Sequence, residues 1–388
     1  MSKLVVLIDG GMLKYSTRFT ARNRLGIAHD APLSELANHL GTLPAIYDCL
    51  ASLLRSRLSA IEHVLGKIDR CIICQDIGNS WRCNIQKTVI PGTDKASSID
   101  YKGHRRTDDP DELAAIVKLN SIHSKALRFI ADNSGIELVG KQGIEADDFM
   151  VLLARNYANQ GDQVIIFSKD ADITQAVQTT DAGGHIIIMQ PVYTKGYASG
   201  AVQFVIDPKL AEAANTKTTI FDITGGLPNG LMTIAKQAQV IAPQYMLLTK
   251  ILNGDASDDI SPVMCKVVNG KTYKLTAKQL DAIFAAVVAL HPDVKYVEYD
   301  DLYRMQSILM ILYIAHKLMH KQDFDALPTD WQQFYISKFI ENRKMVCINS
   351  QELAGRYVET LRAATEQLTG MTPTIAFPSW QVLQQLGL

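Results

Sequence analysis

The sequence predicts an α/β fold with a mainly parallel central sheet. Three apolar runs, at residues 4–8, 71–74 and 164–167, each lead within a few residues to an aspartate, and stretches with helical periodicity separate them. A continuous apolar run is typical of a strand buried on both faces, and strands that alternate with helices usually pair in parallel. Because parallel strands end at one edge of the sheet, the acidic side chains that follow them are expected to meet there.

The other elements follow from periodicity. A helical stretch from Ser34 to Leu65, with Ser34 as its cap and Pro44 as a break or kink, separates the first two strands. Further helices are expected at 112–133, after Asp148, at 245–252 and at 302–319, with strands at 136–139 and 185–189. The segment 193–242 is weakly patterned. Its Gly225–Gly230 turn lacks the flanking strand and helix of a phosphate-binding loop.

The composition is that of an ordinary soluble protein, with 47% hydrophobic and 20% charged residues in 388. The N-terminus is too soon interrupted by Asp9 to be a signal peptide, and the apolar segment 308–319 is too short to span a membrane. We therefore expect a cytoplasmic protein without a membrane partner. Cys71 and Cys74 lie in an apolar run, which favours reduced core thiols over a zinc or redox site.

Acidic residues gather between Glu145 and Asp172. Five carboxylates lie at the start of a helix and just past a strand: Glu145, Asp147, Asp148, Asp170 and Asp172. A single aspartate after a strand is more often the cap of the next helix. Three strands in succession that deliver an acid, joined by this cluster, favour a divalent-metal site, because clustered negative charges are unfavourable without cations. Only oxygen ligands are present, which selects magnesium or manganese.

Two polar stretches are candidates for contact with nucleic acid. Residues 79–111 form a long irregular segment, either a functional loop or a disordered one, whose aromatic and cationic residues are of the types that stack on bases and pair with phosphates. Residues 245–263 form a helix and a turn into an expected second helix, a motif that can hold a duplex backbone. This turn is not a calcium loop, because Ile260 and Lys266 occupy the glycine and glutamate positions.

Six motifs in order resemble the signatures of the flap endonuclease and 5′-nuclease superfamily, and most of all the tailed-phage ribonuclease H enzymes. They are Asp9, Asp76 with Ser80-Trp81-Arg82, Tyr101-Lys102-Gly103-His104-Arg105, Gly143-Ile144-Glu145-Ala146-Asp147-Asp148, Ser168-Lys169-Asp170-Ala171-Asp172 and Gly254-Asp255-Ala256-Ser257-Asp258-Asp259. The resemblance covers residues 4–275. It implies a PIN-like 5′-nuclease core, a helical arch, a helix-turn-helix-type duplex-binding motif and a helical C-terminal region.

The resemblance also implies roles for individual residues. One magnesium or manganese ion would be held by Asp9, Asp76, Glu145 and Asp147, and a second would be surrounded by Asp148, Asp170, Asp172, Asp255 and Asp258. Lys102 and Arg105 would steady the scissile phosphate as catalytic residues. Nucleic-acid contacts would come from Trp81, Arg82, Tyr101, Arg106, Lys250, Ser257 and Lys266. Ile260-Ser261-Pro262-Val263 replaces the glycine-rich sequence of relatives outside the phage branch, which weighs against a potassium site.

The implied activity is two-metal hydrolysis of phosphodiester bonds in RNA·DNA hybrids and in flapped or nicked duplexes. The implied division is a nuclease core at 1–244, with the arch region at 79–125 and an insertion at 193–242, a helical hairpin at 245–290 and a helical region at 291–388. The net charge of −1 does not exclude a nucleic-acid partner, because without the nine candidate ligands the remaining chain carries +8.

Alternatives and partners stay open at this point. A PIN-like endonuclease acting on single-stranded RNA would share the acids but lack the duplex-binding hairpin, and a non-catalytic DNA-binding protein could keep the same fold. We expect a monomer, with a single-strand-binding protein or a sliding clamp as candidate partners. The C-terminal residues Gln384–Leu388 faintly resemble clamp-docking peptides, although a helix packed on its own core is the favoured interpretation.

Overall fold

The structure is a computed structural model that describes residues 2–97, 100–194, 197–215, 238–290, 304–348, 363, 366–374 and 377. The chain divides into two compact units. Unit 1 comprises Met1–Asn79, Thr107–Ile241 and Leu353–Leu388, and unit 2 comprises Ser80–Arg106 and Ala242–Glu352. The predicted arch region at 79–125 is thus shared between the two units, and the predicted boundary at 290 stays a prediction.

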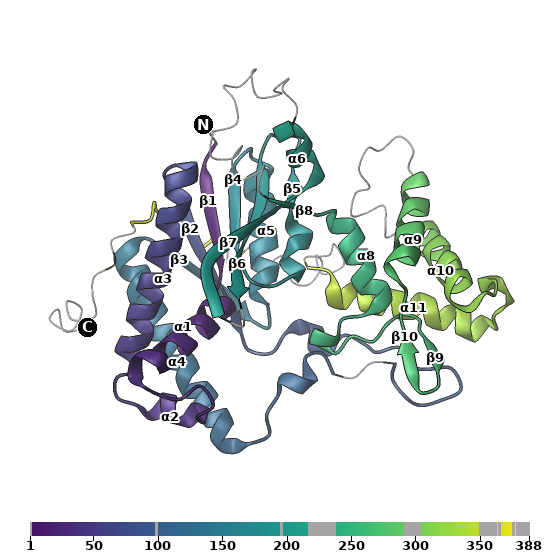
Figure 1. Cartoon of the computed structure of the whole chain (residues 1–388), viewed down its shortest axis with the longest axis horizontal. Coiled ribbons are helices and arrows are strands. Elements are labelled where there is room, and N and C mark those ends of the chain that lie inside the picture. The colour runs from purple at the N-terminus through teal and green to yellow at the C-terminus, as the bar shows by residue number, and fades with distance from the viewer. Residues whose placement is uncertain are drawn as a thin grey trace. The chain divides into compact units, whose positions relative to one another are not determined.

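Unit 1 is built on an eight-stranded sheet with the order β3-β2-β1-β4-β6-β7-β8, in which β5 pairs with β6 (Figure 1). Its strands are β1 Leu4–Asp9, β2 Arg70–Ile77, β3 Glu137–Gln142, β4 Gln163–Phe167, β5 Gln178–Thr179, β6 His185–Thr194, β7 Tyr197–Ile206 and β8 Gln239–Val240. The four central pairings, from β3 to β6, are parallel, which confirms the predicted α/β fold.

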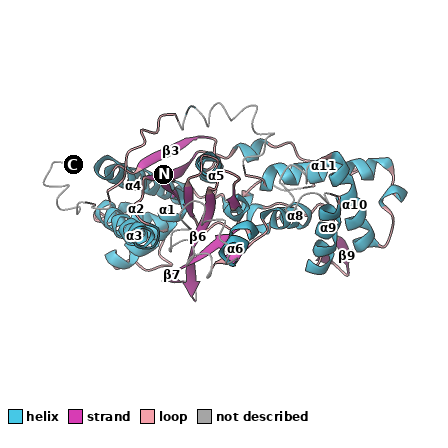
Figure 2. Cartoon of the chain, turned by 90° about the horizontal axis from the view of Figure 1, so that it is seen from above, coloured by secondary structure: helices cyan, strands magenta, loops and turns pink. Residues whose placement is uncertain are grey.

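Helices cover both faces of this sheet (Figure 2). They are α1 Gly10–Leu25, α2 Leu33–Asn38, α3 Thr42–Leu65, α4 Pro110–Ser134, α5 Ala146–Ala158 and α6 Pro208–Asn215. Val6 and Ile8 of β1 belong to the core shared with α1, α3 and α4, whereas the alternate residues Val5 and Leu7 are buried outside that cluster. Helix α5 contacts five strands, from β3 across to β6. Burial on both faces explains the continuous apolar runs.

Two details of unit 1 differ from the prediction. The stretch 34–65 is not one helix broken at Pro44. Helix α2 ends at Asn38, and Pro44 lies in the first turn of α3, where its missing N–H costs nothing. The cap of α2 is Pro32, not Ser34. The weakly patterned segment after 193 contains strand β7, which pairs antiparallel with β6, while the Gly225–Gly230 turn lies outside the described residues.

Unit 2 is mainly helical. Its elements are η1 Trp81–Asn84, η2 Gly103–Arg105, α8 Pro243–Asn253, η4 Ala256–Asp258, β9 Lys266–Val268, β10 Lys271–Tyr273, α9 Ala277–Ala289, α10 Met305–His320, η6 Phe324–Ala326 and α11 Thr329–Val346. A second hydrophobic core joins α8, α9, α10 and α11 and includes Tyr101. The turn after α8 was expected to lead directly into a second helix, and this expectation is wrong. A short η4 turn and the β9–β10 ribbon come before α9.

Among the helices that the structure describes, none is both long and apolar enough to cross a membrane. Cys71 and Cys74 are buried free thiols in β2, as predicted.

Candidate metal centre and nucleic-acid interface

Asp9 ends β1 and begins α1. Its Oδ1 accepts a hydrogen bond from the backbone N–H of Met12 at 3.0 Å, and its Oδ2 accepts one from Ser168 Oγ at 2.8 Å. The first bond makes Asp9 the N-cap of α1. The second ties it to the segment that follows β4. The capping role and a place in the acidic site therefore coexist in one side chain.

Asp76 and two glycines bring the ends of β1 and β2 close together. Asp76 Oδ1 accepts a hydrogen bond at 2.7 Å from the backbone N–H of Ala146, the first residue of α5. A Cβ atom at Gly11 would lie 3.1 Å from Asp9 Oδ1 and 3.3 Å from Asp76 Oδ2, and one at Gly10 would lie 2.6 Å from the Cys74 carbonyl oxygen. Residues without a side chain therefore let α1 start directly against β2.

The start of α5 contributes three carboxylates. Oxygens of Glu145, Asp147 and Asp148 lie within 4.8 Å of one another. Glu145 is the N-cap, and its backbone N–H donates to Asp148 Oδ2 at 3.4 Å. The positive end of a helix dipole partly offsets the concentrated negative charge, but it supplies only about half an elementary charge. Three carboxylates at this spacing therefore have the ligand chemistry that a hard divalent cation takes.

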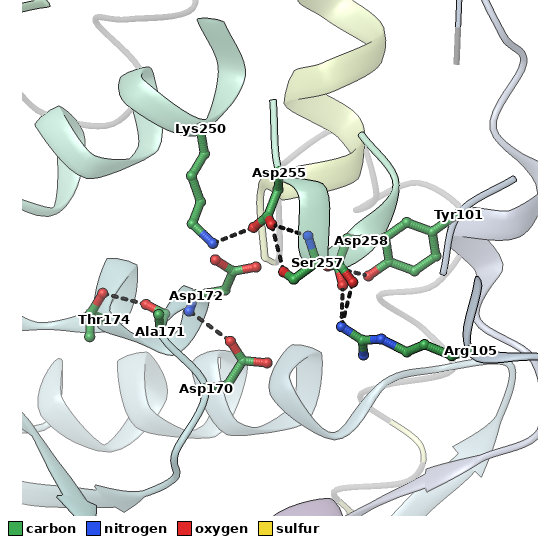
Figure 3. A network of polar contacts seen from close by, with 10 residues as sticks. All are labelled: Tyr101, Arg105, Asp170, Ala171, Asp172, Thr174, Lys250, Asp255, Ser257 and Asp258. Carbon is green, nitrogen blue, oxygen red and sulfur yellow. Dashed lines mark hydrogen bonds and ion pairs between the residues drawn. The ribbon is translucent and has the colours of Figure 1, made fainter. Parts of the chain in front are cut away.

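The loop after β4 places two more acids. Ser168, which is buried, accepts a hydrogen bond from the Asp170 backbone N–H at 3.0 Å through its Oγ. Asp170 Oδ1 in turn accepts one from the Asp172 backbone N–H at 2.8 Å (Figure 3). Because Ser168 also donates to Asp9, it links the two strand ends. Ser168 belongs to the motif at 168–172, but the motif alone does not indicate this linking role.

Electrostatics confirm that these carboxylates act on one another. Burial raises the pKa of Asp9 from 3.8 to about 6. The negative charges of Asp76 and Asp170 raise it further, against the hydrogen bonds from Met12 and Ser168 that lower it. Asp9 is thus a carboxyl whose ionised form needs a cation nearby. Unit 1 brings together seven predicted ligands, Asp9, Asp76, Glu145, Asp147, Asp148, Asp170 and Asp172, in a set of hard oxygen donors that fits magnesium or manganese.

The other two predicted ligands, Asp255 and Asp258, lie in the turn after α8 of unit 2. Asp255 Oδ1 accepts hydrogen bonds from the backbone N–H and the Oγ of Ser257, at 2.8 and 2.5 Å, and Lys250 Nζ lies 2.6 Å from Oδ2 (Figure 3). Burial acts to raise the pKa of Asp255, but the hydrogen bonds from Lys250 and Ser257 outweigh it, so the pKa lies below its ordinary value. Asp255 is therefore stabilised as a carboxylate by the protein itself.

Asp258 joins the turn to the segment 100–106. Arg105 Nη2 donates to Asp258 Oδ1 at 2.9 Å and to the Ser257 carbonyl at 2.6 Å, and Tyr101 Oη donates to Asp258 Oδ2 at 3.3 Å. The backbone N–H of Lys102, which has a φ of 51°, donates to the Asp258 carbonyl at 3.1 Å. Asp258 is thus contacted by the guanidinium of Arg105 and by the backbone of Lys102. Whether Asp255 and Asp258 bind metal stays a prediction.

Three of the predicted nucleic-acid contacts are buried. Arg82 is 2% exposed; its Nε and Nη2 donate to the carbonyls of Met345 and Cys347, each at 3.1 Å, and its guanidinium lies 4.6 Å from the Trp81 ring centre. Tyr101 lies in the core of unit 2. Both rings are buried, and base stacking by Trp81 and Tyr101 stays a prediction. Arg106 is exposed and bonds Cys83 Sγ at 3.4 Å.

Two exposed aromatic residues on α1 were not predicted from the sequence. Tyr15 is 71% exposed and Phe19 is 40% exposed, and the two are four residues apart on one face of the helix that Asp9 caps. Leu13, on the opposite side of the helix from Tyr15, is buried. Aromatic faces of this kind are where unpaired bases stack.

Residues 69–203 match the family model described as the 5'-3' exonuclease, N-terminal resolvase-like domain. The match covers about a third of the chain, and this part of the chain resembles the 5′→3′ exonuclease family. The matched segment contains β2, β3, α5 and β4, the elements that carry six of the seven acids of unit 1. This match and the acidic cluster at the start of α5 together indicate a metal-dependent nuclease.

The fold resembles that of one solved structure. The T5 D15 protein crystallised with metal ions aligns with a TM-score of 0.50 at 14% identity, over 94% of this chain and 98% of that one. The T5 5′-exonuclease with bound zinc aligns at 0.49 and 14%, over 95% and 100%. The bacteriophage T5 D15 flap endonuclease in a complex with DNA and metal ions aligns at 0.41 and 15%, over 88% and 100%. No curated protein matches the sequence.

Proposed function

We propose that this nuclease is structure-specific and removes RNA primers and 5′ flaps during phage DNA replication, in the host cytoplasm, leaving a 5′-phosphate and a 3′-hydroxyl. The observation that supports this most is the set of seven carboxylates at one edge of the sheet, in a chain whose residues 69–203 match the 5'-3' exonuclease N-terminal domain. The relatives of known structure are named as an exonuclease and a flap endonuclease.

The acids divide between two ions in our proposal. Asp9, Asp76, Glu145 and Asp147 would hold one, and Asp148, Asp170 and Asp172 would hold the second. Magnesium at such a site supplies Lewis-acid stabilisation of the phosphate charge and lowers the pKa of water. The protein's own part is orientation. Met12 and Ser168 each donate to one oxygen of Asp9, and Ala146 donates to Oδ1 of Asp76, so both carboxylates are held in a fixed orientation for a ligand.

The cations of unit 2 would position the substrate. Arg105 is held by the Ser257 carbonyl and by Asp258, and its side chain remains half exposed. A guanidinium fixed on one side can present its other N–H groups to a phosphate. Lys102 contributes a second cation next to it, with Nζ 4.8 Å from the Tyr101 ring centre. In this arrangement the pair would orient the scissile phosphate rather than transfer protons.

Product mapping tests the proposal. End-labelled 5′-flap, nicked and RNA·DNA substrates and a plain single strand would be incubated with magnesium, with and without chelator. We expect cuts near the flap junction and in the RNA of the hybrid, with 5′-phosphate products and no cutting in chelator. Preference for the plain single strand would contradict the proposal and favour the PIN-like single-strand RNA endonuclease. Cleavage that survives chelation would contradict the metal assignment.

A further inference from the structure

Helix α11 of unit 2 carries a buried ion pair. Lys338 Nζ lies 2.7 Å from Glu341 Oε1, three residues further along the helix, and the two side chains are 1% and 2% exposed. Burial lowers the pKa of Lys338, although the hydrogen bond and the charge of Glu341 act to raise it. A buried ion pair contributes little net stability, because the cost of removing two charges from water offsets their attraction. Stability alone therefore does not explain the pair.

The second oxygen of Glu341 binds the backbone of a segment that is distant in sequence. Glu341 Oε2 accepts a hydrogen bond at 2.5 Å from the backbone N–H of Thr88, which lies 253 residues earlier in the chain. The two carboxylate oxygens thus join different groups, one the ammonium of Lys338 and the other the segment that contains Thr88. A side chain whose orientation is locked by a second partner holds its first partner more exactly.

Thr88 begins a small hairpin, residues 88–97. The N–H of Ser97 donates to the Thr88 carbonyl at 2.8 Å, and the N–H of Ile90 donates to the Lys95 carbonyl at 3.0 Å. Pro91-Gly92 lies at its tip, and Gly92 has a φ of 73°. A glycine with positive φ directly after a proline is typical of a type II turn. The hairpin is therefore bonded within itself, and a shift at Thr88 also shifts Ser97.

The residue next to Glu341 on α11 holds the turn that follows α8. Asn342 is fully buried, and its Nδ2 donates to the carbonyls of Ile251 and Ser261, each at 2.8 Å. Ser261 Oγ donates in turn to the Ser97 carbonyl at 2.6 Å. Two neighbouring residues of α11 thus fix the hairpin 88–97 to the turn that contains Asp255 and Asp258.

Exposed ion pairs connect the hairpin to the two cations that we propose orient the substrate. Lys87 Nζ lies 2.5 Å from Asp100 Oδ1, and Arg106 Nη1 lies 3.7 Å from Asp100 Oδ2. Lys102 and Arg105 lie between Asp100 and Arg106 in sequence. The Asp100 side chain is 66% exposed, and ion pairs at such a surface contribute little. The buried contacts of α11 are therefore the stronger restraint on this part of unit 2.

We propose that Lys338 and Glu341 are a positioning pair, which fixes the hairpin 88–97 through Thr88 and thereby sets the orientation of Lys102 and Arg105 toward the scissile phosphate. This inference rests on the proposed function in that these cations act on a phosphate of the substrate. A displacement of about 1 Å in a group that orients the substrate costs on the order of a hundredfold in rate. A pair with little net effect on stability can therefore control the rate of cleavage.

Two double variants without the buried charges isolate the contact to Thr88. Lys338→Met/Glu341→Leu removes the acceptor, and Lys338→Met/Glu341→Gln keeps a side-chain carbonyl in its place. Single-turnover cleavage of a 5′-flap substrate with magnesium, flap binding in chelator and urea unfolding would be measured for both. We expect the Leu variant to cut at least about tenfold more slowly than the Gln variant, with flap Kd values within about threefold. The Gln variant should cut within about threefold of the wild type, and both should unfold cooperatively with similar midpoints.

A second background separates positioning from a general structural role. Both double variants would also be made in a chain that carries Lys102→Ala/Arg105→Ala. If the pair acts through these cations, the Leu and Gln variants should differ by less than about twofold in this background, because effects that pass through one group are not additive. A tenfold difference that persists there would overturn the inference, and so would equal rates of the two variants in the original background.

Amide hydrogen exchange distinguishes a failure of this inference from a failure of the proposed function. Exchange over residues 100–106 should be faster in the Leu variant than in the Gln variant, because the segment is no longer fixed through Thr88. Equal exchange in the two variants would overturn the positioning role. If exchange differs as expected but the wild type cuts no substrate with magnesium, the contact positions the segment and the proposed function fails.

Discussion

The surroundings of the acids in unit 1 and of the acids in the unit 2 turn shift carboxylate pKa values in opposite directions. In unit 1, burial and neighbouring carboxylates raise the pKa of Asp9 to about 6. In unit 2, Lys250 and Ser257 lower the pKa of Asp255, and Arg105 pairs with Asp258. An aspartate can thus be buried beside other carboxylates, as Asp9 is, or be paired with a lysine or arginine side chain. The difference teaches that an acidic motif must be read with its neighbours before it is assigned to a metal.

The largest expected effect is the loss of stability caused by a substitution in the unit 2 turn. Gly254 has φ 68° and ψ 179°, a conformation that only glycine adopts readily, and a Cβ there would lie 2.2 Å from the Ile260 carbonyl oxygen. Gly254→Ala should therefore destabilise the turn by about 3 kcal/mol or more. Amide hydrogen exchange in α8 and the turn would show it. Normal protection in this variant would mean that the turn can rearrange at little cost.

The next effect concerns pH and Asp9. In chelator, a carboxyl whose pKa is higher in the folded state than its ordinary 3.8 binds more protons when folded, so its unfavourable contribution develops as the pH rises from 3.8 through about 6. Asp9→Asn should stabilise the metal-free protein by about 2 to 3 kcal/mol at pH 7 and by well under 1 at pH 4. Urea unfolding at the two pH values measures this. With magnesium present the sign should reverse, and a gain that is independent of pH would contradict the account.

Gly11 offers a milder test of the unit 1 acids. Gly11→Ala places a Cβ 3.1 Å from Asp9 Oδ1 and 3.3 Å from Asp76 Oδ2, which forces the two carboxylates to shift. We expect manganese to bind roughly tenfold more weakly, by calorimetry, with little loss of stability. Gly41→Ala is a matched control, because its Cβ would be equally crowded, 3.1 Å from Leu25 Cδ2, but far from any acid of the site in sequence and element. Equal losses in both variants would point to general strain.

The smallest effect concerns the internal cation of unit 2. Because the pKa of Asp255 is lowered, its paired carboxylate stabilises the fold above the ordinary value of 3.8, and this contribution disappears as the pH falls below that value. Lys250→Gln should cost about 1 kcal/mol at pH 7 and nothing measurable at pH 2.5. The exposed pair Lys317–Asp323 supplies the control, since Lys317→Gln should leave stability unchanged at both pH values. A pH-independent cost for Lys250→Gln would assign its role to packing of the alkyl chain.

Much of unit 1 could be predicted because its signals are redundant. The apolar run 4–8 leads directly to Asp9, and the apolar run 71–74 leads to Asp76 after one further residue, so the sheet edge and the acidic cluster followed from one pattern. The roles of Gly11 and Ser168 could not be predicted in the same way. Both depend on the closeness of strands that are distant in sequence, and this closeness exists only once the register is known.

Unit 2 was predicted less well, for two physical reasons. Asn269-Gly270 between Val267-Val268 and Lys271-Thr272 is a strong hairpin signal, but the resemblance favoured a second helix at that place. Tyr101 and Trp81 were assigned to nucleic-acid contact from the resemblance and from residue type. An aromatic ring serves a core and a base equally well, and only the packing of α8, α9, α10 and α11 shows that Tyr101 lies in a core.

The central claim is that the unit 1 acids form the metal-dependent catalytic site. Asp147→Asn tests it most directly, because the substitution removes one charge at the start of α5 and keeps the size of the side chain. Single-turnover cleavage of a 5′-flap substrate with magnesium would be compared with the wild type and with Asp132→Asn, an exposed acid at the end of α4. We predict a loss of at least about a hundredfold for Asp147→Asn, the cost of weakened metal catalysis, and none for the control. Cleavage by Asp147→Asn at the wild-type rate would contradict the account.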